Sequence, residues 1–243
     1  MVVDDTPDPE MEVVYTWAEG QLARAGIRFD VLRPEVSGTE RMYAAEKRNL
    51  LISATRTQWL MLMDDDDIAL PNMVSLLLAE AYRSGADLVS GFCNNFKTYQ
   101  DYGLKKDLYV ALAAGYAQGG SFFVHNTGKA TMLIKRDVAE RAGGCTMDNT
   151  GEQSPYVDWD LYTNIGLAGY KISFVPTAVY RYRERSKNSI YYSIDAEGRW
   201  LGHRKMVMSW CRKLQLTLEE CDVLEFSRGK LAKPFVLTFG EYE

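Results

Sequence analysis

Four consecutive aspartates directly after an apolar segment are the strongest chemical signal in the sequence. Residues 58–63 consist of Gln58 and a continuous apolar run, typical of a strand buried on both faces, and residues 64–67 are all aspartate. Adjacent carboxylates repel one another, and a divalent cation neutralises them. Because Asp64 and Asp66 point the same way in an extended chain, both can reach one Mg²⁺ or Mn²⁺ ion or its bound water. The alternative is a solvated acidic turn that caps a helix beginning at Pro71.

Two further acidic positions lie far from this cluster in the sequence. Asp4 and Asp5 follow Val2-Val3, which resembles the last turn of a buried strand. Asp158 stands at the start of a predicted helix and next to Trp159. Asp158 is either a helix N-cap, worth about 1 kcal/mol, or a general base held at a helix start. Trp159 is either an aromatic surface for a sugar ring or part of the core, and we favour the core.

Strands and helices alternate along the chain and must position these acids. We predict strands at residues 27–32, 58–63, 86–92, 130–134, 171–175 and 178–182. We predict helices at residues 9–25, 40–54, 71–84, 158–167 and 197–226. This alternation indicates an α/β fold with a mixed, mainly parallel sheet flanked by helices, in which ligands bind beyond the carboxyl ends of strands. Without repeats or a linker, residues 1–190 form one domain, and residues 191–243 form a helical extension packed on it.

Composition narrows the class of protein. Of the 243 residues, 47% are apolar and 25% are charged, which is typical of a globular protein and excludes a disordered chain. The net charge of -5 excludes the basic surface of a nucleic-acid-binding protein. The four cysteines contain no CxxC pair, and reduced thiols suit the cytoplasm. The sequence shows no signal peptide or membrane-spanning segment, so we expect a cytoplasmic protein, with peripheral contact at the inner membrane face left open.

The acidic positions and several flanking motifs occur in the order of a known family. The chain resembles a glycosyltransferase of family 2, which has the GT-A fold. The resemblance covers residues 1 to about 185. The matching segments are Val2-Val-Asp-Asp5, Arg48-Asn49, Leu62-Met-Asp-Asp-Asp-Asp67 with its D-x-D motif, Leu70-Pro71, Met132-Leu-Ile-Lys-Arg136, Gly143-Gly144, Asp158-Trp-Asp-Leu161, Gly169-Tyr-Lys-Ile172 and Tyr182-Arg183. Each motif is weak alone, whereas the ordered set with these spacings is specific.

The chain also departs from the family pattern. Thr6-Pro7 replaces Gly-Ser, Val157 replaces an acid, and the absence of Q-x-x-R-W argues against processive synthesis. The family's first strand and helix have no counterpart, because the chain starts where the second strand should end. We therefore expect the strand ending at Asp5 to be frayed, displaced or paired directly with the strand at residues 59–63. We also expect a weakly nucleotide-binding fragment of a longer transferase.

The resemblance implies sugar transfer, with inversion, from a nucleotide diphosphate sugar to an acceptor hydroxyl. It places Asp64 and Asp66 on Mn²⁺ or Mg²⁺ and makes Asp158 the catalytic base. It assigns the nucleotide sugar to a further set of residues: Asp4, Asp5, Arg48, Asp65 and Arg183. The favoured donor is a UDP-sugar, and the acceptor is a glycan, a lipid-linked molecule or another hydroxyl compound.

Two other classes of protein fit part of the pattern. A nucleotidyltransferase also uses a metal-binding acid pair, but residues 158–161 and Tyr182-Arg183 have no role in it. A truncated, non-catalytic domain that binds a partner fits the missing first strand, whereas retention of all the acids weighs against it. Donor turnover distinguishes these alternatives from a transferase.

Overall fold

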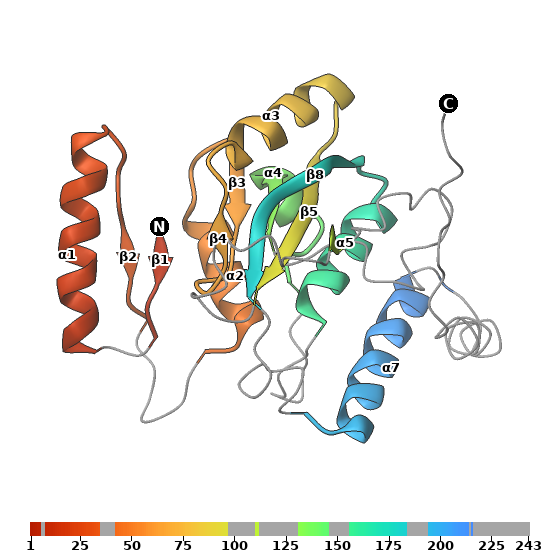
Figure 1. Cartoon of the computed structure of the whole chain (residues 1–243). Coiled ribbons are helices and arrows are strands. Elements are labelled where there is room, and N and C mark those ends of the chain that lie inside the picture. The colour runs from red at the N-terminus through yellow and green to blue at the C-terminus, as the bar shows by residue number, and fades with distance from the viewer. Residues whose placement is uncertain are drawn as a thin grey trace.

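The computed structural model describes residues 1–5, 8–34, 42–96, 110–111, 131–145, 156–183, 194–213 and 215. In Figure 1, a small N-terminal unit lies beside a larger body built on one central sheet. The C-terminal helix lies on the side of that body opposite the N-terminal unit. Among the described residues, no helix is long and apolar enough to span a bilayer.

The N-terminal unit is a small β-α-β element. Strands β1 (Val2–Val3) and β2 (Val31–Leu32) pair in parallel, and helix α1 (Pro9–Arg24) connects them. The helix begins where expected, because the Asp8 side chain accepts a hydrogen bond from the Glu10 amide and a proline follows at the first helical position. None of the residues of α1 is buried, so this unit has little core of its own.

The central sheet has six strands in the order β3-β7-β5-β8-β4, with β6 paired to β5. The strands are β3 (Trp59–Leu62), β4 (Ile68–Ala69), β5 (Leu88–Phe96), β6 (Val110–Ala111), β7 (Met132–Lys135) and β8 (Ile172–Arg183). The sheet is mixed, as expected, but among the described strands only β5 and β8 are parallel within it. The expectation of a mainly parallel sheet is therefore wrong for this region. The reason is that β7 lies between β3 and β5 and runs antiparallel to both. β3 and β5 therefore point the same way but are not hydrogen-bonded to each other.

Helices cover both faces of this sheet. They are α2 (Ala44–Ala54), α3 (Met73–Ser84), α4 (Arg136–Arg141) and α5 (Val157–Leu167), whereas α7 (Ala196–Lys213) packs against α5. Successive strand residues enter opposite cores, as the period of two requires. Leu88 and Ile134 face the core formed with α2, α4 and α5, whereas Val89 and Leu133 face the core formed with α3. All four side chains are at most 3% exposed.

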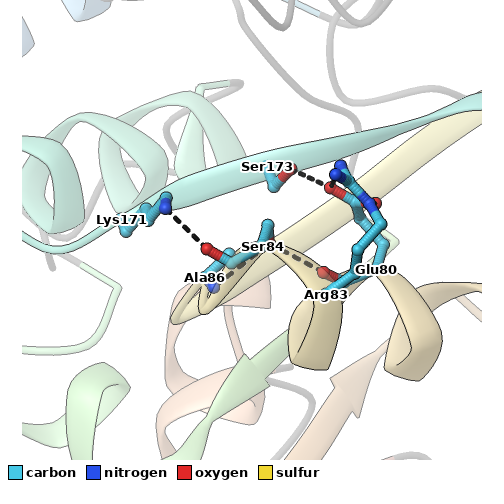
Figure 2. Close-up of polar contacts among 6 residues, drawn as sticks. All are labelled: Glu80, Arg83, Ser84, Ala86, Lys171 and Ser173. Carbon is cyan, nitrogen blue, oxygen red and sulfur yellow. Dashed lines mark hydrogen bonds and ion pairs between the residues drawn. The ribbon is translucent and has the colours of Figure 1, made fainter.

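The end of α3 is tied to the beginning of β8 by polar contacts (Figure 2). The Glu80 carboxylate accepts hydrogen bonds from Arg83 and from the Ser173 hydroxyl. The Lys171 ammonium donates to the Ser84 carbonyl. Gly85 then ends the helix in the left-handed conformation at φ 68°, as expected from its position.

The first strand of the chain is separated from the central sheet. β1 pairs with β2 in its own two-stranded sheet, and β3 pairs with β7. Of the arrangements expected for β1, the described strands therefore show the displaced one and not direct pairing with β3. Two predicted strands around Pro176 form the single strand β8, which carries irregular register shifts opposite residues 91–93 of β5.

Candidate functional site

The two acids after β1 interact with different helices: Asp5 with α2 and Asp4 with α1. The Asp5 carboxylate is 6% exposed and accepts hydrogen bonds from the Lys47 ammonium and the Met42 amide, both at 2.8 Å. Burial alone would raise the pKa of Asp5, but these contacts lower it overall. Asp4 lies on the α1 side, where burial and the Asp4 charge raise the pKa of Tyr15. The two predicted nucleotide-binding acids thus face different parts of the protein.

Arg48 connects the acid cluster after β3 to the predicted base. Its guanidinium donates to Asp64 Oδ1 at 2.8 Å and is only 12% exposed. Burial alone would lower the pKa of Arg48, but the charges of Asp64 and Asp158 raise it overall. Asp64 and Asp158, which are far apart in the sequence, therefore act on one buried cation.

The fourth aspartate is held by the sheet itself. Asp67 Oδ1 accepts a hydrogen bond from the Arg183 amide at 3.0 Å, and Oδ2 accepts one from the Thr131 hydroxyl at 3.5 Å. Burial raises the pKa of Asp67 to about 7, and the neighbouring charges of Asp64 and Asp66 act in the same direction. Burial and the nearby carboxylates thus both disfavour a negative charge on Asp67.

Tyr182 lies near the predicted site, although sequence reasoning gave it no role. Burial raises its pKa, and the charges of four aspartates contribute: Asp67, Asp158, Asp64 and Asp66. The phenol therefore lies within electrostatic reach of both the acid cluster and the first turn of α5. Its place in a Tyr-Arg pair at the end of an apolar strand was the signal that could have found it.

Asp158 is the second residue of α5, and the helix N-cap is Tyr156. The N-cap alternative for Asp158 is therefore wrong, although an acid in the first turn still interacts favourably with the helix dipole. Trp159 is 2% exposed and contacts Trp210 with ring centroids 5.9 Å apart, so it belongs to the core, as favoured from the sequence.

Asn49 makes a contact that sequence reasoning did not predict. Its amide group donates to the Cys145 carbonyl and accepts from the Cys145 amide, both at 2.8 Å. Gly144 has φ 65°, and a Cβ atom there would lie 2.4 Å from Asn49 Oδ1. A glycine is therefore required for this clamp, which joins α2 to the chain after α4.

The structure brings most of the predicted site residues to one end of the central sheet. Asp64, Asp66, Asp158, Arg48 and the Arg183 backbone gather there, with Asp65 exposed beside them. Asp5 reaches this group only through α2, and Asp4 faces α1. Within the described residues, no group of three or more acidic, histidine or cysteine side chains is arranged to coordinate a metal ion.

Comparison with known proteins agrees with this geometry. Residues 27–141 match the family described as glycosyl transferase family 2. This segment belongs to glycosyltransferase family 2. The matched segment contains β2, α2, the acid cluster, α3 and β7. Comparison with curated proteins finds no match.

Solved structures resemble the whole described chain. One is the mannosyltransferase PcManGT from Pyrobaculum calidifontis in complex with GDP-Man and Mn²⁺, at TM-score 0.60 and 18% identity over 93% of this chain and 59% of that chain. Another is residues 1–349 of TarS from S. aureus in complex with UDP-GlcNAc, at TM-score 0.67 and 13% identity over 96% of this chain and 63% of that chain. At these identities the likeness establishes the fold, which is GT-A. The chain spans about three fifths of the length of these two structures.

Proposed function

We propose that this protein transfers a sugar from a nucleotide diphosphate sugar to an acceptor hydroxyl with inversion of configuration. The observation that carries the proposal is the buried Arg48, which pairs with Asp64 and lies within electrostatic reach of Asp158. A cation paired with an acid cluster suits a diphosphate leaving group, and a further carboxylate acting on the same cation suits a proton acceptor. The family 2 segment supports this chemistry, as do neighbours bound to GDP-Man and UDP-GlcNAc.

Asp64 and Asp66 would hold a divalent cation, Mn²⁺ or Mg²⁺. Their oxygen donors fit such an ion. The pKa of Asp67 is raised to about 7 mainly by burial, and the charges of Asp64 and Asp66, which an ion would neutralise, act in the same direction. Mg²⁺-type sites often use one or two carboxylates and complete their coordination with substrate phosphates and water, which agrees with the absence of a third clustered ligand among the described residues. When bound, the cation would stabilise the departing diphosphate.

Asp158 would act as the general base. As the acceptor oxygen forms a bond to the anomeric carbon, the bond from that carbon to the diphosphate oxygen breaks on the opposite face. The acceptor proton passes to the Asp158 carboxylate, and the electron pair of the broken bond leaves with the diphosphate. Positioned bases of this kind contribute about 10²–10⁴-fold to rate.

The remaining residues would bind the donor. Arg48 can share its guanidinium between Asp64 and a phosphate, because it carries several donors in a planar arrangement. Asp65 is exposed next to the metal ligands, and Arg183 ends β8 at the same edge. Asp5 would contact the nucleoside and also holds α2 through Lys47. Asp4 faces α1, so a contact of Asp4 with the donor is not part of the proposal. A UDP-sugar donor and a glycan or lipid-linked acceptor complete the proposal.

The first test is a donor screen with the full chain and Mn²⁺, using UDP-GlcNAc and GDP-Man among the donors. Release of nucleoside diphosphate supports the proposal. Release of pyrophosphate from a nucleoside triphosphate and sugar phosphate would instead indicate a nucleotidyltransferase. A chain that releases neither product and binds no nucleotide would contradict the proposed function.

The metal assignment has its own experiment. We expect the double variant Asp64→Asn with Asp66→Asn to lose Mn²⁺-dependent UDP or GDP binding in calorimetry. The chain should stay folded, because relief of carboxylate repulsion offsets part of the loss of the Arg48–Asp64 ion pair. The double variant Asp30→Asn with Asp137→Asn removes the same charge outside the site and serves as the control. Metal-dependent affinity that survives in the first variant would remove these two residues as ligands.

A further inference from the structure

Asp160 is a buried carboxylate for which the proposed reaction has no use. It lies on α5 two residues after Asp158 and is only 6% exposed. Its Oδ1 accepts a hydrogen bond from the Trp210 indole N–H at 2.8 Å, and its Oδ2 accepts one from the Asn164 side chain at 3.0 Å. Burying a carboxylate is costly unless its oxygens are hydrogen-bonded, and packing alone would be served by an apolar side chain.

The donor to Asp160 comes from the C-terminal helix. Trp210 is fully buried in α7 and also packs its ring against Trp159 of α5. Lys213, at the end of α7, donates to the side-chain oxygen Oδ1 of Asn164 at 2.5 Å. The two helices thus share a polar network as well as an aromatic contact, and Figure 1 shows them on the same side of the sheet.

The spacing of Asp158 and Asp160 on α5 links this network to the predicted base. Successive helical residues are about 100° apart, so Asp158 and Asp160 project from nearly opposite sides of the helix. Asp158 acts on Arg48 at the end of the sheet, and Asp160 bonds to α7. A rotation of α5 that loosened the Asp160 contact would therefore displace the Asp158 carboxylate relative to the donor site.

We infer that Asp160, held by Trp210, is a positioning residue that sets where Asp158 presents its carboxylate. The inference rests on the proposed function, since it concerns the same base. It makes α7 a determinant of turnover although none of the proposed site residues lies on this helix. Displacement of a catalytic group by about 1 Å can cost about 100-fold in rate, so small rotations of α5 are sufficient.

The experiment is a double-mutant cycle on turnover of UDP-GlcNAc or GDP-Man with Mn²⁺. Trp210→Phe keeps a ring against Trp159 and removes the N–H donor. We expect it to lower kcat about 10-fold and to change the donor KM less than about 3-fold. Combined with Asp158→Asn, it should lower the rate no further than Asp158→Asn alone, because both changes act through one group.

Trp59→Phe in β3 is the matched control, since among the described residues its buried indole N–H has no hydrogen-bond partner. We expect its kcat to stay at the wild-type value even if its melting temperature falls. Additive effects of Trp210→Phe and Asp158→Asn, or an unchanged kcat in Trp210→Phe, would overturn the inference while leaving the proposed function intact. A wild-type chain that turns over no donor in the screen and binds no nucleotide would overturn both.

Discussion

The N-terminal β1–α1–β2 unit and the central sheet each contain a strand that is followed by acidic residues, yet the two regions are built very differently. The unit has two strands of two residues each, and α1 buries none of its side chains. The central sheet has a strand of 12 residues and another of 9, paired in parallel and covered by helices on both faces. Large apolar side chains remain exposed on α1, including Val13 at 71% and Trp17 at 65%.

The difference shows that the two acid groups depend on different forces. Asp67 is held by backbone and side-chain groups of well-buried strands, so core packing sets the position of the cluster after β3. Asp5 is held mainly by Lys47 and Met42 of the segment around α2, so a local ion pair and one hydrogen bond set its position. Changes in the core should therefore affect the first group, and changes in charge should affect the second.

Hydrogen exchange should show the largest contrast. The amides of Val2 and Asp4, which bond to β2, should open by local unfolding of the small unit. The amides inside β5 and β8 should exchange only on global unfolding, and thus at least about 10³-fold more slowly. The measurement is exchange at neutral pH with mass spectrometry or NMR. Similar protection in both regions would show that the unit is as stable as the central sheet.

Truncating one leucine in each region compares how much the N-terminal unit and the central body contribute to the free energy of unfolding. Leu77 on α3 is fully buried, so Leu77→Ala should lower the free energy of unfolding by about 2–5 kcal/mol. Leu22 on α1 is half-buried, so Leu22→Ala should cost less than about 1 kcal/mol. Urea unfolding followed by circular dichroism measures both. Equal losses would mean that α1 contributes to the cooperative core.

Gly144→Ala tests the connection from α2 to the central body. Gly144 has φ 65°, and its new Cβ would meet Asn49 Oδ1 at 2.4 Å, so we expect a loss of about 1–3 kcal/mol. Gly143→Ala is the control, because Gly143 has φ 88° with open space around its Cβ position. The excess loss in Gly144→Ala measures the Asn49 clamp, and equal losses in thermal unfolding would show that the clamp adds nothing.

Lys47→Met should have the smallest effect, below about 1 kcal/mol at pH 7, because the Lys47 ammonium is partly exposed. The lowered pKa of Asp5 stabilises the fold above its ordinary value near 3.8, and this contribution disappears as pH falls through the lowered value. Wild type and variant should therefore differ at pH 7 and converge in acid, below the lowered pKa of Asp5. Arg28→Met removes an exposed partner of Asp30 and is the control. It should change neither the stability at pH 7 nor its dependence on pH. A difference that persists in acid would exclude the ion pair as its cause.

Much of the secondary structure could be predicted because its signals are local. The apolar run before Asp64 predicted β3, and Gly85 predicted the end of α3. β4, with two residues after the aspartates, is too short to show a pattern. The direction of β7 was also missed, because a short apolar strand looks the same in either orientation.

The residue types of the candidate site could also be predicted, but their partners could not. A run of carboxylates after an apolar strand can be recognised from the sequence alone. The contacts of Asn49 with Cys145 and of Asp160 with Trp210 join residues 96 and 50 positions apart. No periodicity encodes such pairs, since they follow from how α2 and α7 dock on the rest of the protein.

Lys47, Arg48 and Asn49 are consecutive on α2, and each binds a different segment of the chain. The helix therefore tolerates changes of length poorly. One residue inserted between the helix start and Lys47 would turn all three side chains by about 100° and shift them by 1.5 Å. It would release Asp5, Asp64 and Cys145 in a single step, whereas three separate point substitutions are needed for the same result. Natural and engineered variants of this protein should accordingly vary in loop length around α2 before they vary in length within it.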